Sequence, residues 1–388
     1  MDDNGVPTLI YSGNRDGVQR ACLATSSDGL LTWQKHPGNP VIAEPPPDLQ
    51  LVAFRDHSVW REDGAWYQVI GAGLEGQGGA TLLYRSADLQ TWEYLHPLLV
   101  GDMQRFTPIW TGSMWECPDF FALDGRHVLI VSVWDTGQLH YSAAMVGNYR
   151  DHQLVAEVEH KLDYGDQHFY APQSFTDARG RRIIFGWVHE GRGAQEQIAS
   201  GWSGVMSLPR VLSLGPNGHV CMQPAPELDV LRTEHTHHGP ITVPAGEVVD
   251  LPGVSGDTME LRVEMAPGRD GGCGVIVHRA ADGAEETRIV YDGVQQQLIV
   301  DRTRSSLDLG TDRNPHSAPL TLEPGESLRL HIFLDRSVLE IFANERVSVT
   351  TRIYPTRPDT LGVALVAEGA DARLEALDAW QMRSIWEA

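Results

Sequence analysis

The sequence predicts an all-β protein: a β-propeller of the five-bladed type, with about one blade missing and four visible, followed by a C-terminal β-sandwich. Three observations predict this fold class. A unit made of a turn and a strand recurs in the first half of the chain, helical periodicity is nearly absent, and the second half contains many short alternating strands. The chain has 388 residues, which is long enough to bury two separate cores.

The repeated unit is a tight polar turn followed by a β-branched or aromatic run. Asp-Gly and Asn-Gly accept the positive φ that tight hairpin turns require, so we expect a hairpin at each copy. The glycines of the four turns lie 55 to 61 residues apart, a period typical of propeller blades of about four strands. The copies are Asp3-Asn4-Gly5 before Thr8 to Tyr11, Asp63-Gly64 before Trp66 to Ile70, Asp124-Gly125 before Val128 to Val133, and Gly180 before Ile183 to Trp187.

A second element repeats on the same period. Ser26-Ser27-Asp28 leads to Trp33, and Ser86-Ala87-Asp88 leads to Trp92, each after a short strand. Each unit is therefore expected to close on a polar turn and a tryptophan. The first hairpin copy begins at the third residue, so its sheet has no room for a first strand, and we expect the chain to begin inside the second blade.

The second half follows a different pattern. From about Val248, apolar and polar residues alternate in short runs that are separated by turn signals, which favours a two-sheet sandwich. The segment before it is rich in His, Pro and Gly and includes a short stretch whose pattern suggests a helix. We therefore predict a propeller domain over residues 1–221, a linker over 222–239 and a sandwich domain over 240–388.

Composition excludes several classes of partner. The formal charge of −22 argues against nucleic acid and against an anionic membrane surface, whereas a neutral sugar meets no electrostatic barrier. No segment reaches the ~18 apolar residues of a membrane span, and the first residues do not form a signal peptide. The four cysteines are scattered, so neither a zinc site nor a disulfide framework is indicated, and no metal or cofactor is implied. These features favour a cytoplasmic location.

Two carboxylates occupy matching places in successive units. Glu116 lies in an apolar run directly before the Asp124-Gly125 hairpin, and Asp56 lies in the run before Asp63-Gly64. Inner propeller strands line a central funnel, and cleavage of a glycosidic bond needs two carboxyl groups that face each other. A solvent-facing glutamate and a structural Arg55–Asp56 ion pair are the plainer interpretations. The equivalence of the two positions favours a functional one.

These residues resemble the motifs of glycoside hydrolase family 32. Trp115-Glu116-Cys117-Pro118-Asp119 matches the W-E-C-P-D motif of that family, whose glutamate is the acid/base, and Phe54-Arg55-Asp56 matches the F-R-D-P motif, whose aspartate stabilises the transition state. The similarity extends over nearly the whole chain. Further matching stretches are Tyr170 to Phe175, Phe185 to Trp187, Gly201 to Arg210 and Leu334 to Phe342.

Two departures from the family pattern matter. His57 stands where the family has the proline of F-R-D-P, which leaves the detailed substrate open. The W-M-N-D-P-N-G motif, which carries the nucleophilic aspartate, has no match. The first residues, Met1 to Gly5, resemble it superficially, but Asp3-Asn4-Gly5 is in register with the other hairpin turns. We therefore expect the nucleophile to be absent from this sequence and the chain as given to be almost inert.

The resemblance implies retaining hydrolysis of terminal β-D-fructofuranosyl units from sucrose, inulin or levan, with Glu116 as acid/base and Asp56 as transition-state stabiliser. Two alternatives stay open: a non-catalytic carbohydrate-binding propeller, and a related inverting furanosidase that acts on arabinose or xylose. The sequence separates neither sucrose from fructan nor hydrolysis from fructosyl transfer, and it does not indicate an oligomeric state. Further candidate substrate-binding residues are Phe54, Arg55, Trp60, Trp115, Tyr170 and Trp187.

Overall fold

The computed structural model describes residues 1–387, in two compact units. Unit 1 consists of Met1–Leu162, Tyr170–Phe175 and Ser213–Val220. Unit 2 consists of Asp163–Phe169, Thr176–Leu212 and the chain from Cys221 onward. Within the described residues, no helix is long and apolar enough to cross a membrane.

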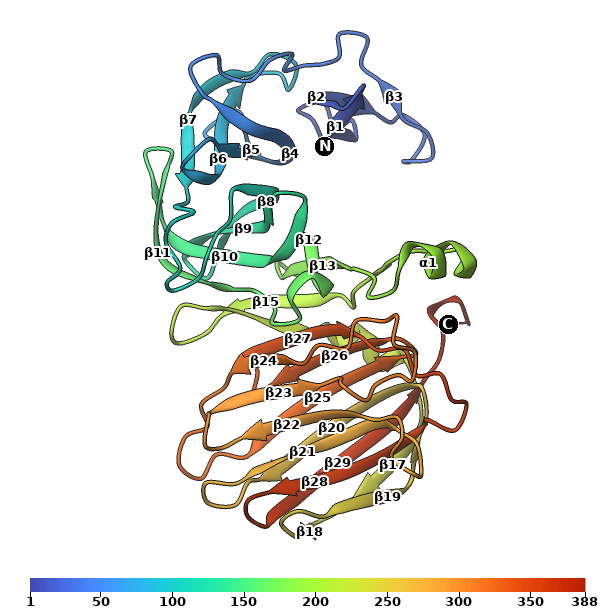
Figure 1. Cartoon of the computed structure of the whole chain (residues 1–388). Helices are drawn as coiled ribbons and strands as arrows, with labels where there is room; N and C mark the ends of the chain where they lie inside the picture. Colours follow the sequence, from blue (N-terminus) through green and yellow to red (C-terminus); the bar gives the residue numbers. More distant parts are fainter. Residues whose placement is uncertain (388) are drawn as a thin grey trace. The chain divides into compact units, whose positions relative to one another are not determined.

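Unit 1 contains three antiparallel sheets in which strands that are adjacent in sequence pair with each other (Figure 1). The first sheet has three strands and the other two have four. Their strands are β1 (Thr8–Arg15), β2 (Val18–Thr25) and β3 (Gln34–Lys35); β4 (Leu51–Glu62), β5 (Ala65–Leu74), β6 (Gly78–Ser86) and β7 (Glu93–Val100); and β8 (Met114–Leu123), β9 (Arg126–Asp135), β10 (Gln138–Arg150) and β11 (Gln153–Lys161).

The hairpin turns form where the sequence predicts them. Asp63 and Gly64 have φ of 47° and 78°, and Asp124 and Gly125 have φ of 48° and 80°. Two successive positive φ values match the twist of antiparallel strands, which explains the Asp-Gly pairs. The turns align β4 with β5 and β8 with β9, so β4 and β8 become end strands of their sheets.

The sheets of unit 1 differ in how deeply they are packed. Strands β5 and β9 are almost continuously buried and supply the apolar cores. Strand β1, which corresponds to them in the repeat, has no fully buried residue among its eight. It is the end strand of a three-stranded sheet, since within the described residues only β2 pairs with it.

A further sheet has the strand order β12-β13-β15-β16, with β14 paired to β13. Short helical segments flank it, and helix α1 ends at Gly201, whose φ of 78° closes the last turn. The elements of this region are η1 (Asp166–His168), β12 (Tyr170–Thr176), β13 (Arg182–Val188), α1 (Ala194–Ser200), β14 (Val205–Met206), β15 (Arg210–Leu214), β16 (Val220–Pro224) and η2 (Pro226–Leu231).

Two larger sheets enclose the core of unit 2, with apolar residues alternating into the space between them. One has the order β17-β29-β20-β25-β26-β27 with β18 paired to β29, and the other has the order β19-β28-β21-β22-β23-β24. The elements are β17 (Arg232–His238), β18 (Ile241–Val243), β19 (Val248–Ser255), β20 (Thr258–Ala266), β21 (Gly272–Arg279), β22 (Thr287–Asp292), β23 (Gln297–Asp301), β24 (His316–Pro319), β25 (Leu328–Asp335), β26 (Val338–Ala343), β27 (Val347–Arg352), β28 (Gly362–Glu368), β29 (Ala372–Met382) and η3 (Ile385–Glu387).

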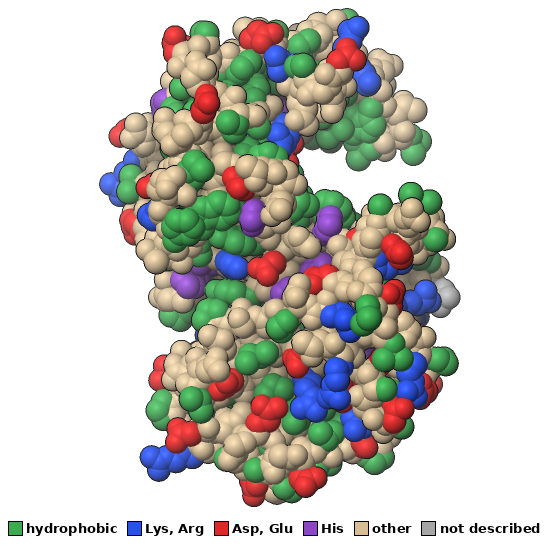
Figure 2. Space-filling view, viewed as in Figure 1, with side chains coloured by type: hydrophobic (Ala, Val, Ile, Leu, Met, Phe, Trp, Pro, Cys, Tyr) green, Lys and Arg blue, Asp and Glu red, His purple; other side chains and the backbone are tan. Residues whose placement is uncertain are grey.

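The segment 222–239, which the sequence predicts to be a linker, contains the end of β16, helix η2 and strand β17. Strand β17 pairs antiparallel with β29. The domain boundaries at 221 and 240 stay predictions. On the visible face in Figure 2, acidic, basic, polar and apolar side chains are mixed, as expected of a surface with both signs of charge.

Candidate active site

Strands β4 and β8 carry the two candidate carboxylates and share an irregularity at the same place. The pairing of β4 with β5 shifts between Arg55 and His57, and that of β8 with β9 shifts between Glu116 and Asp119. At the shifts, Asp56 has a φ of 67° and Cys117 a φ of 46°. A bulge of this kind re-aims a side chain, and non-glycine residues rarely adopt it without compensation.

The Glu116 carboxylate is held by two neighbours. Arg55 donates to Oε1 from Nε at 3.1 Å and from Nη2 at 2.7 Å, and the Tyr170 hydroxyl donates to Oε2 at 2.7 Å. The Arg55 guanidinium also lies 5.7 Å from the centroid of the Trp134 ring. The side chains of Arg55 and Glu116 keep 16% and 17% of their surface exposed, so this ion pair is accessible to a small ligand.

Asp56 is tied to the same strand as Glu116. Its Oδ2 accepts a hydrogen bond from the backbone N–H of Cys117 at 2.9 Å, and the Cys117 thiol lies 3.5 Å from it. The backbone N–H of Asp56 donates to the Ser12 hydroxyl at 2.9 Å. One hydrogen bond therefore joins the residue beside Glu116 to the Asp56 carboxylate, which brings the two predicted site residues together.

The groups around the two carboxylates stay protonated at neutral pH. Burial, together with the charges of Asp56 and Glu116, raises the pKa of the Cys117 thiol well above its usual value. Burial and the Glu116 charge likewise raise the pKa of the Tyr170 hydroxyl. Both groups therefore serve as neutral hydrogen-bond donors, and neither is a nucleophile at neutral pH.

Several aromatic residues of the predicted site lie in apolar cores. Trp115 is 1% exposed, and its Nε1 donates to the Thr111 carbonyl at 2.8 Å. Phe54 is buried against Tyr84, with ring centroids 6.3 Å apart. Trp60 packs between the rings of Tyr67 and Phe120, whose centroids are 5.8 and 5.0 Å from its own.

Trp187 belongs to unit 2, whereas Glu116 belongs to unit 1. Its ring meets the edge of His189, with centroids 4.6 Å apart, and packs over Gly204, where an added Cβ would collide with the indole Nε1. Of the predicted substrate-binding residues, Arg55 and Tyr170 are the two whose polar atoms contact Glu116.

Sequence reasoning missed four residues around the site. Ser12 and Ser132 accept hydrogen bonds from the backbone of residues with positive φ, Trp134 lies beside Arg55, and Gln173 Nε2 donates to the carbonyls of Cys117 and Pro118 at 3.1 and 3.3 Å. A signal for the serines existed, because both lie seven residues after the glycine of a repeated turn. Gln173 lies within the matching stretch from Tyr170 to Phe175.

The donors around Glu116 and Asp56 are N–H and O–H groups, an arrangement suited to holding carboxylates and sugar hydroxyls. Among the described residues there is no group of three or more His, Cys, Asp or Glu side chains that could hold a metal ion.

Sheets of sequentially paired strands followed by a two-sheet sandwich, with a glutamate and an aspartate on successive end strands, are the features that we expect of a glycoside hydrolase from the sequence. The chain belongs to glycosyl hydrolase family 32. The family's N-terminal domain matches residues 1–224, and its C-terminal domain matches residues 227–381. The resemblance seen in the W-E-C-P-D and F-R-D motifs is therefore confirmed.

Known proteins resemble the chain over most of its length. It is 32% identical to sucrose-6-phosphate hydrolase of Escherichia coli, over 98% of this chain and 78% of the relative, and 30% identical to raffinose invertase of E. coli, over 98% and 79%. The crystal structure of fructan 1-exohydrolase IIa from Cichorium intybus matches with a TM-score of 0.86 at 24% identity, over 98% of this chain and 82% of that one. The predicted propeller and sandwich are confirmed by this likeness of fold.

Proposed function

We propose that the site acts on terminal β-D-fructofuranosyl units of sucrose, inulin or levan type substrates, by the retaining mechanism. The observation that carries the proposal is the pair of carboxylates on successive end strands, linked by the hydrogen bond from Cys117 N–H to Asp56 Oδ2 at 2.9 Å. Retaining cleavage needs an acid/base and an attacking carboxylate ~5 Å apart, and hydroxyl contacts that strengthen in the transition state. Glu116 takes the first role, and Asp56 makes the hydroxyl contacts.

The neighbours of Glu116 fit the acid/base role. Glu116 gives its proton to the leaving oxygen and then, as a carboxylate, activates water for the second step. Arg55 and Tyr170 donate to both carboxylate oxygens and stabilise this second form. Tyr170 keeps its proton at neutral pH, so it remains a donor throughout.

Asp56 fits the binding role. Its Oδ2 is committed to the Cys117 N–H, whereas Oδ1 makes no hydrogen bond with the described residues. A carboxylate with one fixed oxygen and one open oxygen accepts hydroxyl donors in a defined direction. The vicinal hydroxyls of a furanosyl ring supply such donors.

The attacking carboxylate is the missing part of this mechanism. The W-M-N-D-P-N-G motif of the family has no match in the sequence. We therefore propose that the 388 residues alone bind fructosides but turn them over very slowly, since loss of a nucleophile costs several orders of magnitude in rate.

The test combines calorimetry with an assay of released fructose. The 388-residue chain is titrated with fructose, sucrose and 1-kestose, and sugar release is measured from sucrose, inulin and levan. Binding with turnover at least about a thousandfold below that of a typical glycosidase supports the proposal. Hydrolysis at a normal rate contradicts the missing nucleophile. Activity on arabinosides or xylosides, without affinity for fructosides, contradicts the substrate class.

A further inference from the structure

Three end strands of consecutive sheets carry the same backbone irregularity. Asp56 on β4, Cys117 on β8 and Ala171 on β12 have φ of 67°, 46° and 48°. Each follows a residue that contributes to the polar cluster, namely Arg55, Glu116 or Tyr170. A left-handed non-glycine residue on a strand is strained, so the surrounding structure must hold it in place.

Each irregular residue is held in the same way. Its backbone N–H donates to a side-chain oxygen of the preceding sheet, at 2.9 Å in all three cases. The acceptors are Ser12 Oγ for Asp56, Asp56 Oδ2 for Cys117 and Ser132 Oγ for Ala171. Without such an acceptor the donor would lose its partner in a part-buried place, which is costly.

Two of the acceptors are equivalent in the repeat. Ser12 and Ser132 each lie seven residues after the turn glycines Gly5 and Gly125, on corresponding strands β1 and β9. The same position in the middle sheet is Gly71, seven residues after Gly64. The middle sheet therefore has no hydroxyl at the position where the two neighbouring sheets have a serine.

The middle sheet also lacks room for a side chain at this position. A Cβ on Gly71 would lie 2.3 Å from the Trp115 carbonyl oxygen and 2.8 Å from that of Arg55. The Asp56 carboxylate takes the place of the serine and accepts the N–H of Cys117 instead. The Asp56 carboxylate thus provides the acceptor that a serine provides in the neighbouring sheets. The backbone of Asp56 is itself held by Ser12.

His57 completes this arrangement, at the position where the family motif has proline. Its Nε2 lies 3.4 Å from Ser12 Oγ, and its Nδ1 lies 3.1 Å from Gln68 Oε1. Because Gln68 Oε1 is an acceptor, Nδ1 carries the proton and Nε2 accepts the Ser12 hydroxyl proton. Ser12 Oγ is thereby turned toward the N–H of Asp56. Burial lowers the pKa of His57 to about 4, so the ring is uncharged at neutral pH and one of its nitrogens can accept a hydrogen bond.

We propose that Ser12, oriented by His57, and Ser132 are positioning residues for the two carboxylates. Ser12 holds the backbone of Asp56. Ser132 holds the backbone of Ala171, next to Tyr170, and thereby positions the tyrosine that donates to Glu116. The inference rests on the proposed function for its effect on sugar binding, but not for its effect on the backbone. The two serines act on different carboxylates, so their effects separate.

The test uses residue-specific amide hydrogen exchange in the full chain, followed by titration with fructose. In Ser12→Ala, the amides of Asp56 and Cys117 should exchange roughly tenfold faster, while that of Ala171 stays unchanged. In Ser132→Ala, the amide of Ala171 should exchange faster by a similar factor, while that of Asp56 stays unchanged. His57→Leu should reproduce the Ser12→Ala pattern, and Ser12→Thr, which keeps the hydroxyl, should restore the slow exchange.

Ser58→Ala is the matched control, because Ser58 Oγ accepts the backbone N–H of Phe120 at 3.1 Å from the same strand β4. It should speed exchange at Phe120 alone. Ser12→Ala should weaken fructose binding roughly tenfold, and Ser58→Ala should leave it unchanged. If Ser12→Ala and Ser132→Ala leave the amides of Asp56, Cys117 and Ala171 as slow as in the wild type, or speed them all equally, the inference is wrong. If the amide pattern appears and the wild type binds no fructoside, the positioning stands and the proposed function fails.

Discussion

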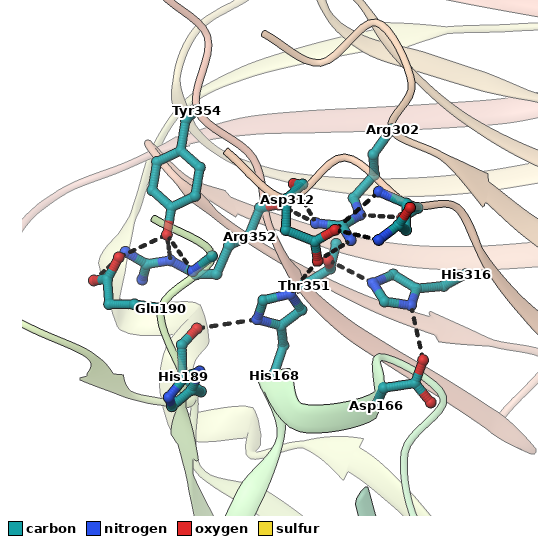
Figure 3. A network of polar contacts seen from close by, with 12 residues as sticks. Asp166, His168, His189, Glu190, Arg302, Asp312, His316, Thr351, Arg352 and Tyr354 are labelled. Atoms are coloured by element: carbon teal, nitrogen blue, oxygen red, sulfur yellow. Dashed lines mark hydrogen bonds and ion pairs between the residues drawn. The ribbon is translucent and has the colours of Figure 1, made fainter. Parts of the chain in front are cut away.

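Two clusters in this molecule consist of the same residue types, glutamate, arginine and tyrosine, but have different surroundings. In unit 1, Glu116 is bonded by Arg55 and Tyr170. In unit 2, Glu190 is bonded by Arg352 and Tyr354 (Figure 3). Arg192 also donates to Glu190. In each cluster a tyrosine hydroxyl donates to the glutamate Oε2 at 2.7 Å. A glutamate, an arginine and a tyrosine in contact therefore do not by themselves define an active site.

The two glutamates differ in the exposure of their side chains and in whether their oxygens can accept further hydrogen bonds. The Glu190 side chain is 1% exposed, and four donors occupy its oxygens, including the backbone N–H of Gly204 at 3.1 Å. Although burial opposes it, these hydrogen bonds lower the pKa of Glu190. The Glu116 side chain is 17% exposed, and it lies next to the residue that holds Asp56. The buried cluster stabilises the fold, while the open one can take a ligand.

The largest expected effect separates the two glutamates by stability. Glu190→Gln leaves Arg352, which is fully buried, without its charge partner, so we expect a loss of ~3–5 kcal/mol in the free energy of unfolding. Glu116→Gln should cost about 1 kcal/mol or less, because Arg55 stays within reach of water. Chemical denaturation of both variants measures the difference. Equal losses would remove the distinction between a structural and a functional cluster.

A buried histidine in unit 1 should make stability depend on pH away from the candidate site. His160 Nε2 accepts the N–H of Val220 at 2.9 Å, and burial, together with His219, lowers the pKa of His160 to about 4. The unfolded chain takes up the proton near pH 6.5, so this contribution is complete above pH 6.5 and is lost as the pH falls toward 4.

The expected size of this loss is about 3 kcal/mol between pH 7 and 4. His160→Gln keeps an acceptor and removes the titration, so its stability should change less over this range than that of the wild type. Denaturation curves at pH 7, 5.5 and 4.5 provide the measurement. Parallel decline in both proteins would show that His160 is not a source of the acid sensitivity.

A smaller effect concerns ligand affinity. Asp56→Asn keeps an oxygen for the Cys117 N–H but replaces the charged acceptor of the sugar hydroxyls. We expect fructose to bind 10- to 100-fold more weakly, with a loss of stability under ~1 kcal/mol. Calorimetric titration checks the affinity. Glu190→Gln, assayed at a temperature where it is folded, is the control and should bind fructose as the wild type does.

The smallest effect is expected at Cys117. Asp56 is held by the backbone N–H of Cys117 rather than by its thiol, and Ala171 adopts a similar positive φ, 48°, on strand β12. Cys117→Ala should therefore adopt the same backbone and keep fructose affinity within about threefold of the wild type. Titration of this variant checks the expectation, and a loss as large as that of Asp56→Asn would mean that the thiol itself holds the carboxylate.

The hairpins and the two carboxylate strands could be predicted from sequence, because Asp-Gly turns require a backbone that few residue pairs accept. The sequence has no local signal for strand β29, Ala372–Met382, since this strand contains no β-branched residue and is defined by its pairing with β17, β18 and β20. Pairing partners far apart in sequence leave no local signal.

The details of the site were harder to predict for a geometric reason. Successive residues on a strand point to opposite faces, so Trp115 enters the core when Glu116 faces the cluster. The bulges at Asp56 and Cys117 break this alternation, and no pattern of apolar residues reports a positive φ. Aligning the repeats on Gly5, Gly64 and Gly125 would have found Ser12, Gly71 and Ser132 as equivalent positions.

A crystal structure of the 388-residue chain with bound sucrose tests the central claim most directly. We predict that the fructosyl ring lies at the open cluster, with ring hydroxyls donating to Asp56 and the glycosidic oxygen within hydrogen-bond reach of Glu116. Unit 2 offers an alternative place, a pocket of about 460 Å³ lined by residues that include Arg262, His331 and Phe333. Sucrose bound in that pocket, with no sugar at Glu116 and Asp56, would contradict the account.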